Sequence, residues 1–90
     1  MLKYTTHNLK KLENIFKESG YQLRYGKGKF SSGYCLLNEK QIIVINKLYD
    51  TEARIVCLLD LLLSINISEE GLEEKTKKHF HEFLKLVEHV

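Results

Sequence analysis

The sequence has only two cysteines, Cys35 and Cys57, and this scarcity argues against a disulfide-stabilised scaffold. The two residues lack CxxC spacing and have no second pair, so they do not form the usual pattern of a structural zinc site. We expect two reduced, mostly buried thiols.

The first residues, MLKYTTHNLKKL, have no long apolar stretch followed by small residues, so they do not resemble a secretory signal. A cytoplasmic location is the resulting expectation.

Hydrophobic runs long enough to cross a membrane are missing as well. The apolar run from Ile55 to Ile67 spans thirteen residues and is interrupted by Asp60 and Ser64. A transmembrane helix needs about 20 apolar residues, so this run has the length of a core helix. We therefore expect no membrane contact.

Recognisable catalytic and cofactor motifs are also missing. No serine stands in a familiar setting with a histidine and an acid, and there is no convincing carboxylate pair or cofactor fingerprint. The turn sequence GKGK at 26–29 differs from a P-loop, because strands flank it and Phe30 follows its second lysine. Cys35 is expected in a strand, where a buried thiol is inert. The sequence predicts neither an enzyme nor a cofactor.

The composition is that of an ordinary globular domain. Ninety residues, of which 43% are apolar and 29% charged, are enough for one core, so we expect a single domain over residues 1–90. The net charge of +2 hides a polarity: residues 1–47 carry nine Lys and Arg against three Glu, and residues 48–90 carry five against nine acidic residues. Such polarity can steer an anionic partner to one half, or let the two halves attract each other.

Periodicity and turn residues predict the element order α-β-β-β-α-α. Apolar residues at helical spacing, with Thr5 as the cap and Gly20 as the stop, predict the first helix. Three β-rich runs follow, separated by glycine and polar turn residues. Asp50 or Thr51 can cap the second helix, and Ser68 can cap the third. The expected ranges are 6–19 for the first helix, 21–25, 30–38 and 41–47 for the strands, the cap to about Asn66 for the second helix, and the residues after Ser68 for the third.

The expected fold class is α+β, with a three-stranded antiparallel meander packed against helices. Strands that are neighbours in sequence usually pair in sequence order, which favours the meander. The third strand is apolar on both faces from Ile42 to Ile45, and this pattern indicates a central or doubly covered position.

The second predicted helix is apolar around more than half of its circumference. Only Ala53, Cys57, Asp60 and Ser64 line up as a narrow, less apolar strip. The simpler interpretation is that the sheet and the other helices cover this helix, with Asp60 and Ser64 facing water. The alternative is that part of its surface is left for a partner, most simply an identical subunit in a two-fold dimer.

The stretch SGYCLLNEKQIIVINKLYDTEARIVCLLDLL resembles a group of small uncharacterised bacterial proteins, and the element order is similar to the front half of the IrrE-type minimal zinc peptidases. In that family a helix, a small sheet and a helix with HExxH follow one another. Leu59, Asp60 and Leu63 stand here where His, Glu and His would stand, and no histidine occurs between His7 and His79. The resemblance therefore implies a peptidase-like fold without its metal site, and no activity.

The C-terminal histidines form an incomplete set of metal ligands. His79 and Glu82 share a helix face, but His81 points elsewhere and His89 is ten residues beyond His79. A complete set would need residues from outside the helix or from another chain. We interpret these residues as the solvated face of a terminal helix and assign no metal site.

Nucleic-acid binding is the main alternative to protein binding. Aromatic and basic residues interleave across the first predicted hairpin, where stacking and phosphate neutralisation could act together. The order α-β-β-β-α is also similar to the double-stranded-RNA-binding domain, but that family has a lysine cluster at the start of its last helix. This chain has YDTE at 49–52 there, and the acidic residues would repel phosphate. The candidate surface for a partner protein or for nucleic acid consists of Tyr21, Arg24, Tyr25, Lys27, Lys29, Phe30 and Tyr34.

The function that these observations favour is a non-enzymatic protein-interaction module on a peptidase-like scaffold. Its partner is an unidentified protein or a second copy of the chain. The alternative is a nucleic-acid-binding domain that uses the basic and aromatic hairpin at 21–34.

Overall fold

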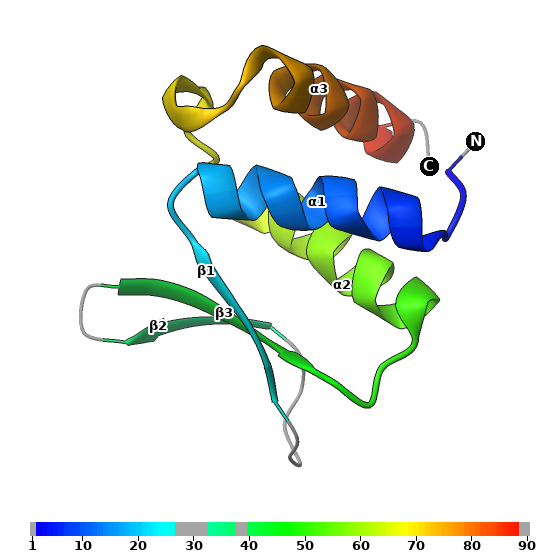
Figure 1. Cartoon of the computed structure of the whole chain (residues 1–90), viewed down its shortest axis with the longest axis vertical. Coiled ribbons are helices and arrows are strands. Elements are labelled where there is room, and N and C mark those ends of the chain that lie inside the picture. Colours follow the sequence, from blue (N-terminus) through cyan, green and yellow to red (C-terminus); the bar gives the residue numbers. More distant parts are fainter. Residues whose placement is uncertain (1, 27–32, 38–39, 89–90) are drawn as a thin grey trace.

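The computed structural model describes residues 2–26, 33–37 and 40–88, with side-chain positions at 2–26 and 41–87. The elements in these residues are α1 (Thr6–Glu18), β1 (Gln22–Gly26), β2 (Gly33–Leu37), β3 (Lys40–Asn46), α2 (Thr51–Ser64), the short 3₁₀ turn η1 (Glu69–Gly71) and α3 (Glu74–Glu88). The helices lie on one side of the sheet (Figure 1). Helix α1 contacts β1, α2 and α3, so it connects the sheet to the outermost helix.

The sheet is mixed, and its strand order is β1-β3-β2. Strand β3 pairs in parallel with β1, where Gln22 is opposite Ile42. It pairs antiparallel with β2, where Tyr34 is opposite Ile43. The antiparallel meander predicted from the sequence is therefore wrong, because β1 does not pair with its sequence neighbour β2 and instead joins the far side of β3. The fold is a mixed α/β arrangement.

Burial explains why β3 occupies the centre of the sheet. Residues 42–45 are buried, except for the half-buried Val44, so both faces of this strand are largely removed from water. Strand β1 alternates instead, with exposed Gln22 and Arg24 on one face, as is usual for a strand with one solvated face. The chain thus follows the apolar pattern of β3 rather than the preference for pairing in sequence order.

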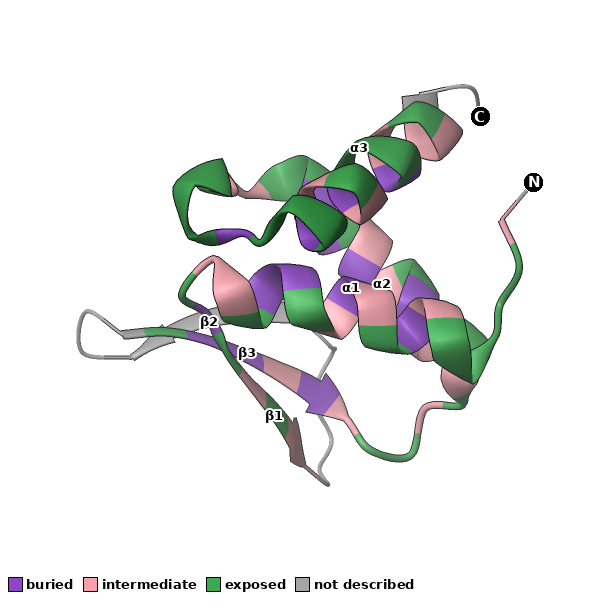
Figure 2. Ribbon diagram, turned by 45° about the horizontal axis from the view of Figure 1, so that its top comes forward, coloured by how far each residue is buried: buried purple, intermediate pink, exposed green. Residues whose placement is uncertain are grey.

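The core lies between the sheet and the helices. The large side chains with no more than traces of exposed surface come from α1, β3 and α2, and they are Leu12, Ile15, Phe16, Ile43, Ile45, Ile55 and Leu58. Figure 2 shows the buried residues on the facing sides of the helices and along β3. Helix α3 adds Phe80 and Phe83 to the same cluster. The apolar spacing that predicted α1 is confirmed by this burial.

Two side chains cap helices as the sequence predicts. The Thr5 hydroxyl accepts a hydrogen bond from the backbone N–H of Asn8 at 3.1 Å. The Asp50 carboxylate accepts one from the N–H of Ala53 at 2.8 Å. Each bond satisfies one of the N–H groups that the first turn of a helix leaves unpaired. Gly20 follows α1 with φ of 101°, the left-handed conformation that ends many helices.

Helix α3 begins later than the sequence predicts. Ser68 makes no side-chain cap bond and precedes only η1, whereas α3 begins at Glu74. The carboxylate of Glu18, at the end of α1, accepts hydrogen bonds from the N–H of Glu73 and the hydroxyl of Thr76, both at 2.9 Å. A carboxylate from another helix therefore satisfies the first turn of α3, where negative charge is favourable.

Gly71 lets η1 approach the end of α1. A Cβ atom at this position would lie 2.6 Å from the backbone oxygen of Glu18, which is closer than real Cβ atoms come.

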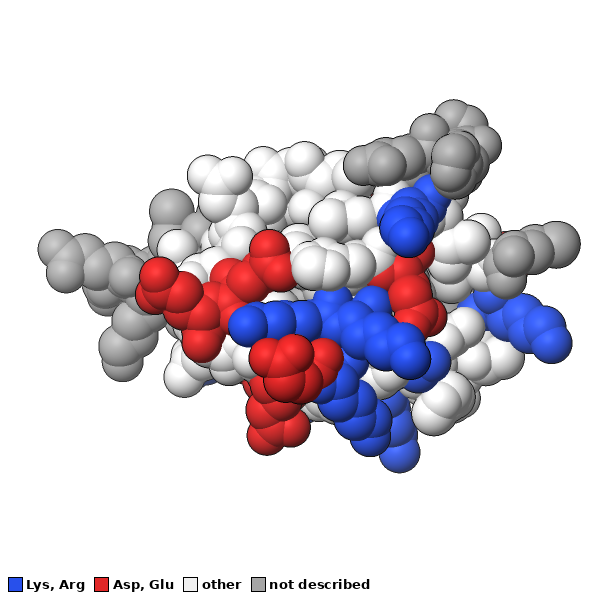
Figure 3. Space-filling model, turned by 90° about the horizontal axis from the view of Figure 1, so that it is seen from above, with Lys and Arg blue, Asp and Glu red and all other residues white. Residues whose placement is uncertain are grey.

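Acidic residues are concentrated around η1 and the start of α3, at 69, 70, 73 and 74. Figure 3 shows most of the acidic side chains in this view toward one end of the molecule, with lysines gathered beside them and further acidic atoms among the lysines.

The long apolar run in the sequence is largely the core helix α2, which has 14 residues. In the described part of the chain, no helix combines the length and the apolar character needed to cross a bilayer.

Candidate functional site

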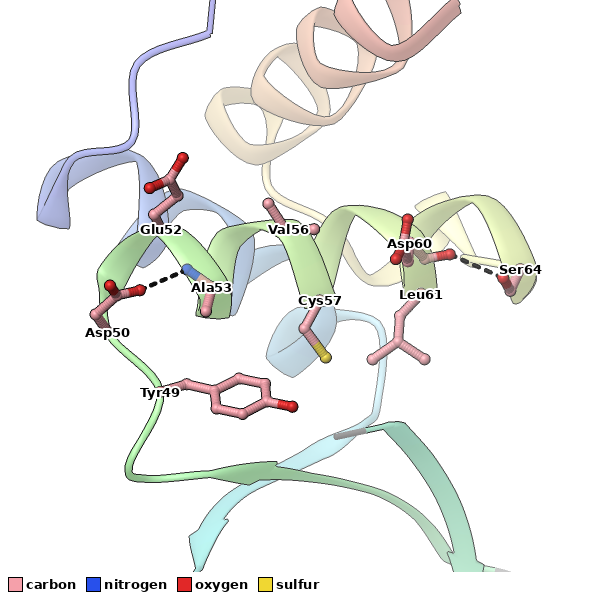
Figure 4. A pocket seen from close by; sticks show the side chains of 9 residues that line it. All are labelled: Tyr49, Asp50, Glu52, Ala53, Val56, Cys57, Asp60, Leu61 and Ser64. Carbon is pink, nitrogen blue, oxygen red and sulfur yellow. Dashed lines mark hydrogen bonds between the residues drawn. The ribbon is translucent and has the colours of Figure 1, made fainter. Parts of the chain in front are cut away.

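A groove of about 660 Å³ runs along α2, and we call it the α2 groove. Its lining residues are Tyr49, Asp50, Glu52, Ala53, Val56, Cys57, Asp60, Leu61 and Ser64. Figure 4 shows Cys57 and Leu61 pointing from α2 toward the sheet, with the ring of Tyr49 beside Cys57. The floor of the groove is therefore mostly apolar.

The helix face beside this groove leaves apolar side chains in water. Val56 is 43% exposed and Leu63 is 57% exposed. The two residues are seven positions apart, which places them two turns apart on one side of α2. Asp60 and Ser64 are exposed on the same side, as the simpler interpretation of the sequence expected. The structure thus leaves part of α2 uncovered by the described residues of its own chain.

The charges in the α2 groove are all negative. Asp50, Glu52 and Asp60 line it, and no Lys, Arg or His is among its nine lining residues. Asp50 is partly engaged as the cap of α2, and the backbone oxygen of Asp60 accepts a hydrogen bond from the Ser64 hydroxyl at 2.8 Å. A ligand in this groove would meet an apolar floor with an acidic rim.

Arg54 lies on the same helix but points away from the α2 groove. Its Nε donates to the backbone oxygen of Tyr49 at 2.9 Å, and its second terminal nitrogen donates to that of Lys47 at 2.8 Å. Its guanidinium carbon lies 4.8 Å from the centre of the Tyr25 ring, a distance typical of cation–π contacts. Arg54 therefore fixes the loop that carries Tyr49 into the groove.

Tyr25 joins this cluster through α1. Its hydroxyl donates a hydrogen bond to the carboxylate of Glu13. Burial raises the pKa of the Tyr25 hydroxyl well above its ordinary value of 10.0, and the hydrogen bond to Glu13 raises it further. The cluster links α1, β1 and α2 beneath the loop at Tyr49, so we assign it a structural role.

The residues of the predicted hairpin surface lie in different environments in the structure. Tyr21 is 7% exposed and packs edge-on against Phe16, with ring centres 6.1 Å apart, so its ring belongs to the core and is not offered for stacking. Arg24 is exposed on β1. Tyr25 is half-buried in the cluster with Arg54, and the backbone of Tyr34 lies in β2.

The remaining members of that surface, Lys27, Lys29 and Phe30, lie outside the described residues. A binding surface formed by the rest of the hairpin stays a prediction.

The positions suggested by the peptidase resemblance lie in the middle of α2. Leu59 is half-buried against the core, whereas Asp60 and Leu63 are exposed. Among the described residues, no group of three His, Cys, Asp or Glu side chains is arranged to hold a metal ion. Asp60 therefore has no metal-binding cluster around it in this part of the chain.

The C-terminal histidines lie in different places. His79 and Glu82 line one small cavity with Asn8 of α1. His81 points elsewhere, with its Nε2 atom 2.6 Å from the carboxylate of Glu69 in η1. His89 lies outside the described residues.

A second groove, of about 380 Å³, lies between α1 and α3, and we call it the α1–α3 groove. Its lining residues are His7, Lys10, Lys11, Asn14, Glu18, Glu73, Lys75, Thr76 and His79. Burial lowers the pKa of His79 below 6.5, and the nearby Lys11 charge lowers it further, while Glu82 opposes the shift. Sequence reasoning did not identify this groove, because its two halves are about sixty residues apart in the chain.

No protein-family model, curated protein or solved structure matches this chain. A function must therefore be argued from the geometry of the two grooves.

Proposed function

We propose that this protein is a non-enzymatic protein-interaction module, in which the α2 groove binds a basic amphipathic segment of a partner protein. The observation that carries the proposal is the exposure of Val56 and Leu63 beside a groove whose only charges are acidic. Exposed apolar side chains that lie together and have a polar rim are typical of interaction surfaces.

The partner's chemistry follows from the lining of the α2 groove. Apolar side chains spaced three or four residues apart on a partner helix would contact Val56 and Leu63, in the helix-in-groove mode of recognition. Lys or Arg on the edges of that helix would lie near Glu52 and Asp60. With 14 residues, α2 is about 21 Å long and can contact several turns of a partner helix.

A second copy of this chain is a less favourable occupant of the α2 groove. A two-fold dimer brings the same patch of both subunits together. Glu52 and Asp60 of one copy would then lie close to the same residues of the other, and like charges at an interface oppose association. The acidic rim therefore supports a different protein as the partner. Light scattering at micromolar concentration distinguishes the two, because a stable dimer would show twice the mass of the chain.

We infer further that the module acts in the cytoplasm on a scaffold similar to the minimal zinc peptidases. The scarcity of cysteines, only two in ninety residues and without CxxC spacing, supports a reducing compartment. Leucines at 59 and 63, where those peptidases have metal-binding histidines, support a binding role in place of catalysis.

Selection from a display library of random peptides as long as α2 tests the proposed partner chemistry. We expect the selected peptides to combine helically spaced apolar residues with Lys or Arg. The variant Val56→Asp/Leu63→Asp should bind them at least about tenfold more weakly, a difference of about 1.4 kcal/mol. Tyr4→Asp changes an apolar side chain that is 47% exposed before α1, and it should leave the affinity unchanged.

The acidic rim is tested separately with matched charge changes. Glu52→Gln/Asp60→Asn should weaken the selected peptides severalfold, and more at low salt than at high salt. Glu70→Gln/Glu74→Gln makes the same change in net charge at exposed positions near α3 and should have little effect. Peptides without a basic preference, or equal binding by both charge variants, would contradict the proposed partner.

A further inference from the structure

The α1–α3 groove combines basic side chains from two helices. His7, Lys10 and Lys11 come from α1, and Lys75 and His79 come from α3. Five of its nine lining residues are therefore Lys or His, in contrast to the α2 groove, which has none. Three of the five, Lys10, Lys11 and Lys75, carry a formal positive charge at pH 7. Like charges gathered in one groove raise each other's energy, and a bound anion would relieve this repulsion.

Two acidic residues also line this groove: Glu73 is exposed, and Glu18 already accepts hydrogen bonds. Both carboxylate oxygens of Glu18 accept hydrogen bonds from the start of α3, one from the N–H of Glu73 and one from the hydroxyl of Thr76. Its negative charge is thus directed at the positive end of the α3 dipole. The Glu18 carboxylate therefore offsets the positive charge of the groove lysines less than a carboxylate without these hydrogen bonds would.

The electrostatic environment of His79 gives a second sign of positive potential. Three of the charged groups that act on it lower its pKa, namely Lys11 and His7 of α1 and Lys75 of α3, and only Glu82 raises it. Burial is the largest cause of the shift. The cations of both helices therefore act on the same point in the groove.

One further lysine, Lys17, extends the basic side chains along α1 beyond the groove. His7, Lys10, Asn14 and Lys17 are all exposed and recur at spacings of three and four residues, so they form one strip along the helix. From His7 to Lys17 this strip is about 15 Å long, at about 1.5 Å per residue. One step along a nucleic-acid strand in a duplex advances about 3.4 Å, so the strip is long enough for several phosphates in a row.

We infer that the α1–α3 groove and the basic strip of α1 form a binding surface for the phosphate backbone of a nucleic-acid strand. Lys10 and Lys75 lie on opposite helices and neutralise phosphates from two sides, and Asn14 is a neutral hydrogen-bond donor between the cations. This surface is separate from the α2 groove. It also differs from the hairpin at 21–34 that the sequence suggested for the same class of ligand.

Fluorescence anisotropy with a fluorescein-labelled, 20-nucleotide single-stranded DNA of mixed sequence tests this surface. We expect binding at low salt that weakens steeply as salt rises, because phosphate contacts release counterions. Lys10→Glu/Lys75→Glu should reduce the affinity at least about tenfold. It should also lower the slope of log affinity against log salt by about 1.4, from two lost contacts at about 0.7 each.

A matched variant controls for the change in net charge. Lys47→Glu/Lys85→Glu makes the same change at two exposed lysines, of which Lys85 lines a different part of α3. We expect it to bind within about threefold of the unchanged protein, with circular dichroism and the thermal midpoint showing that both variants fold. Val56→Asp/Leu63→Asp should retain DNA binding, which separates this test from that of the α2 groove.

Several outcomes would overturn the inference. They are the absence of binding at low salt, equal losses in both charge-reversal variants, and a loss confined to Lys27→Glu/Lys29→Glu, which would return the site to the hairpin. Competition by inorganic phosphate at the same total phosphate concentration would also overturn it, because a surface for a strand gains its affinity from several linked phosphates.

Discussion

The α2 groove and the α1–α3 groove differ in charge and in the origin of their side chains. One helix and the loop before it supply the lining of the α2 groove, which has an apolar floor and an acidic rim. Two helices far apart in sequence supply the α1–α3 groove, which is mainly basic. A chain with a net charge of only +2 thus presents one groove with an acidic rim and one groove with mainly basic side chains.

The two grooves also differ in how far the stability of the fold depends on their side chains. Val56 and Leu63 extend into water, and the described core does not include them. The α1–α3 groove depends instead on the contact between two helices, which Glu18 maintains. Changes at Val56 and Leu63 should therefore affect binding alone, whereas some changes in the α1–α3 groove should also affect stability.

The largest predicted effect compares the two sides of α2. Leu58→Ala removes a fully buried side chain and should lower the free energy of unfolding by about 2–5 kcal/mol. Leu63→Ala removes the same atoms from an exposed position and should change it by about 0.5 kcal/mol or less. Urea unfolding followed by circular dichroism measures both. Similar losses in the two variants would show that Leu63 is a core residue and would remove it from the interaction surface.

The next effect concerns the support of the α1–α3 groove. Glu18→Gln keeps the shape of the side chain but removes the charge that faces the start of α3, and it should cost about 1–2 kcal/mol. Glu82→Gln removes a charge from an exposed position of α3 and serves as the control, with a loss below about 0.5 kcal/mol. Hydrogen exchange should show faster exchange at the Glu73 amide in the first variant only.

A smaller effect is expected at high pH from the cluster beneath the loop at Tyr49. Because burial and the hydrogen bond to Glu13 raise the pKa of Tyr25 above 10.0, the folded protein keeps this proton where the unfolded chain loses it. This contribution to stability is complete below pH 10 and is lost as the pH rises above that value. Tyr25→Phe should therefore lose less stability than the unchanged protein between about pH 9 and pH 11. Parallel losses in urea unfolding would contradict the assignment.

The smallest effect is the titration of His79 in the α1–α3 groove. Its pKa should lie below 6.5 in nuclear magnetic resonance spectra, and the loss of a cation in Lys11→Ala should raise it. Glu82→Gln should lower it further, since Glu82 is the charge that raises it. Because its pKa is lowered in the folded protein, His79 binds a proton more readily in the unfolded chain. Its protonation therefore has no effect on stability well above pH 6.5 and destabilises the folded protein as the pH falls below that value. A shift toward higher pKa on adding the oligonucleotide would sharpen the contrast with the α2 groove.

The helices could be predicted from the sequence because their signals are local. The Thr5 and Asp50 caps each act within three residues, and the buried residues of α1 follow from one periodic pattern. The start of α3 could not be predicted, because its capping carboxylate comes from Glu18, more than fifty residues earlier. The sheet order was also missed, although the apolar residues 42–45 contained the relevant signal.

Of the candidate sites, the sequence left open whether part of α2 is uncovered, and it placed Asp60 and Ser64 toward water, where they are exposed. It could not distinguish Val56 and Leu63 from the buried leucines, because that depends on where the other helices lie. The hairpin surface included Tyr21, whose burial against Phe16 no local pattern reveals. The α1–α3 groove required knowledge of which helices are neighbours.

The order of strands in the sheet has a consequence for how the chain folds. Leu37 pairs with Lys40, so β2 and β3 can form a local hairpin, whereas Gln22 of β1 must find Ile42, twenty residues later. Closing the longer loop costs more entropy, and β1 has no partner until β3 is in place. We therefore expect α1 and β1 to dock late onto a preformed β2–β3–α2 unit, and pulse-labelled hydrogen exchange should protect the amides of β3 that face β2 before those of β1.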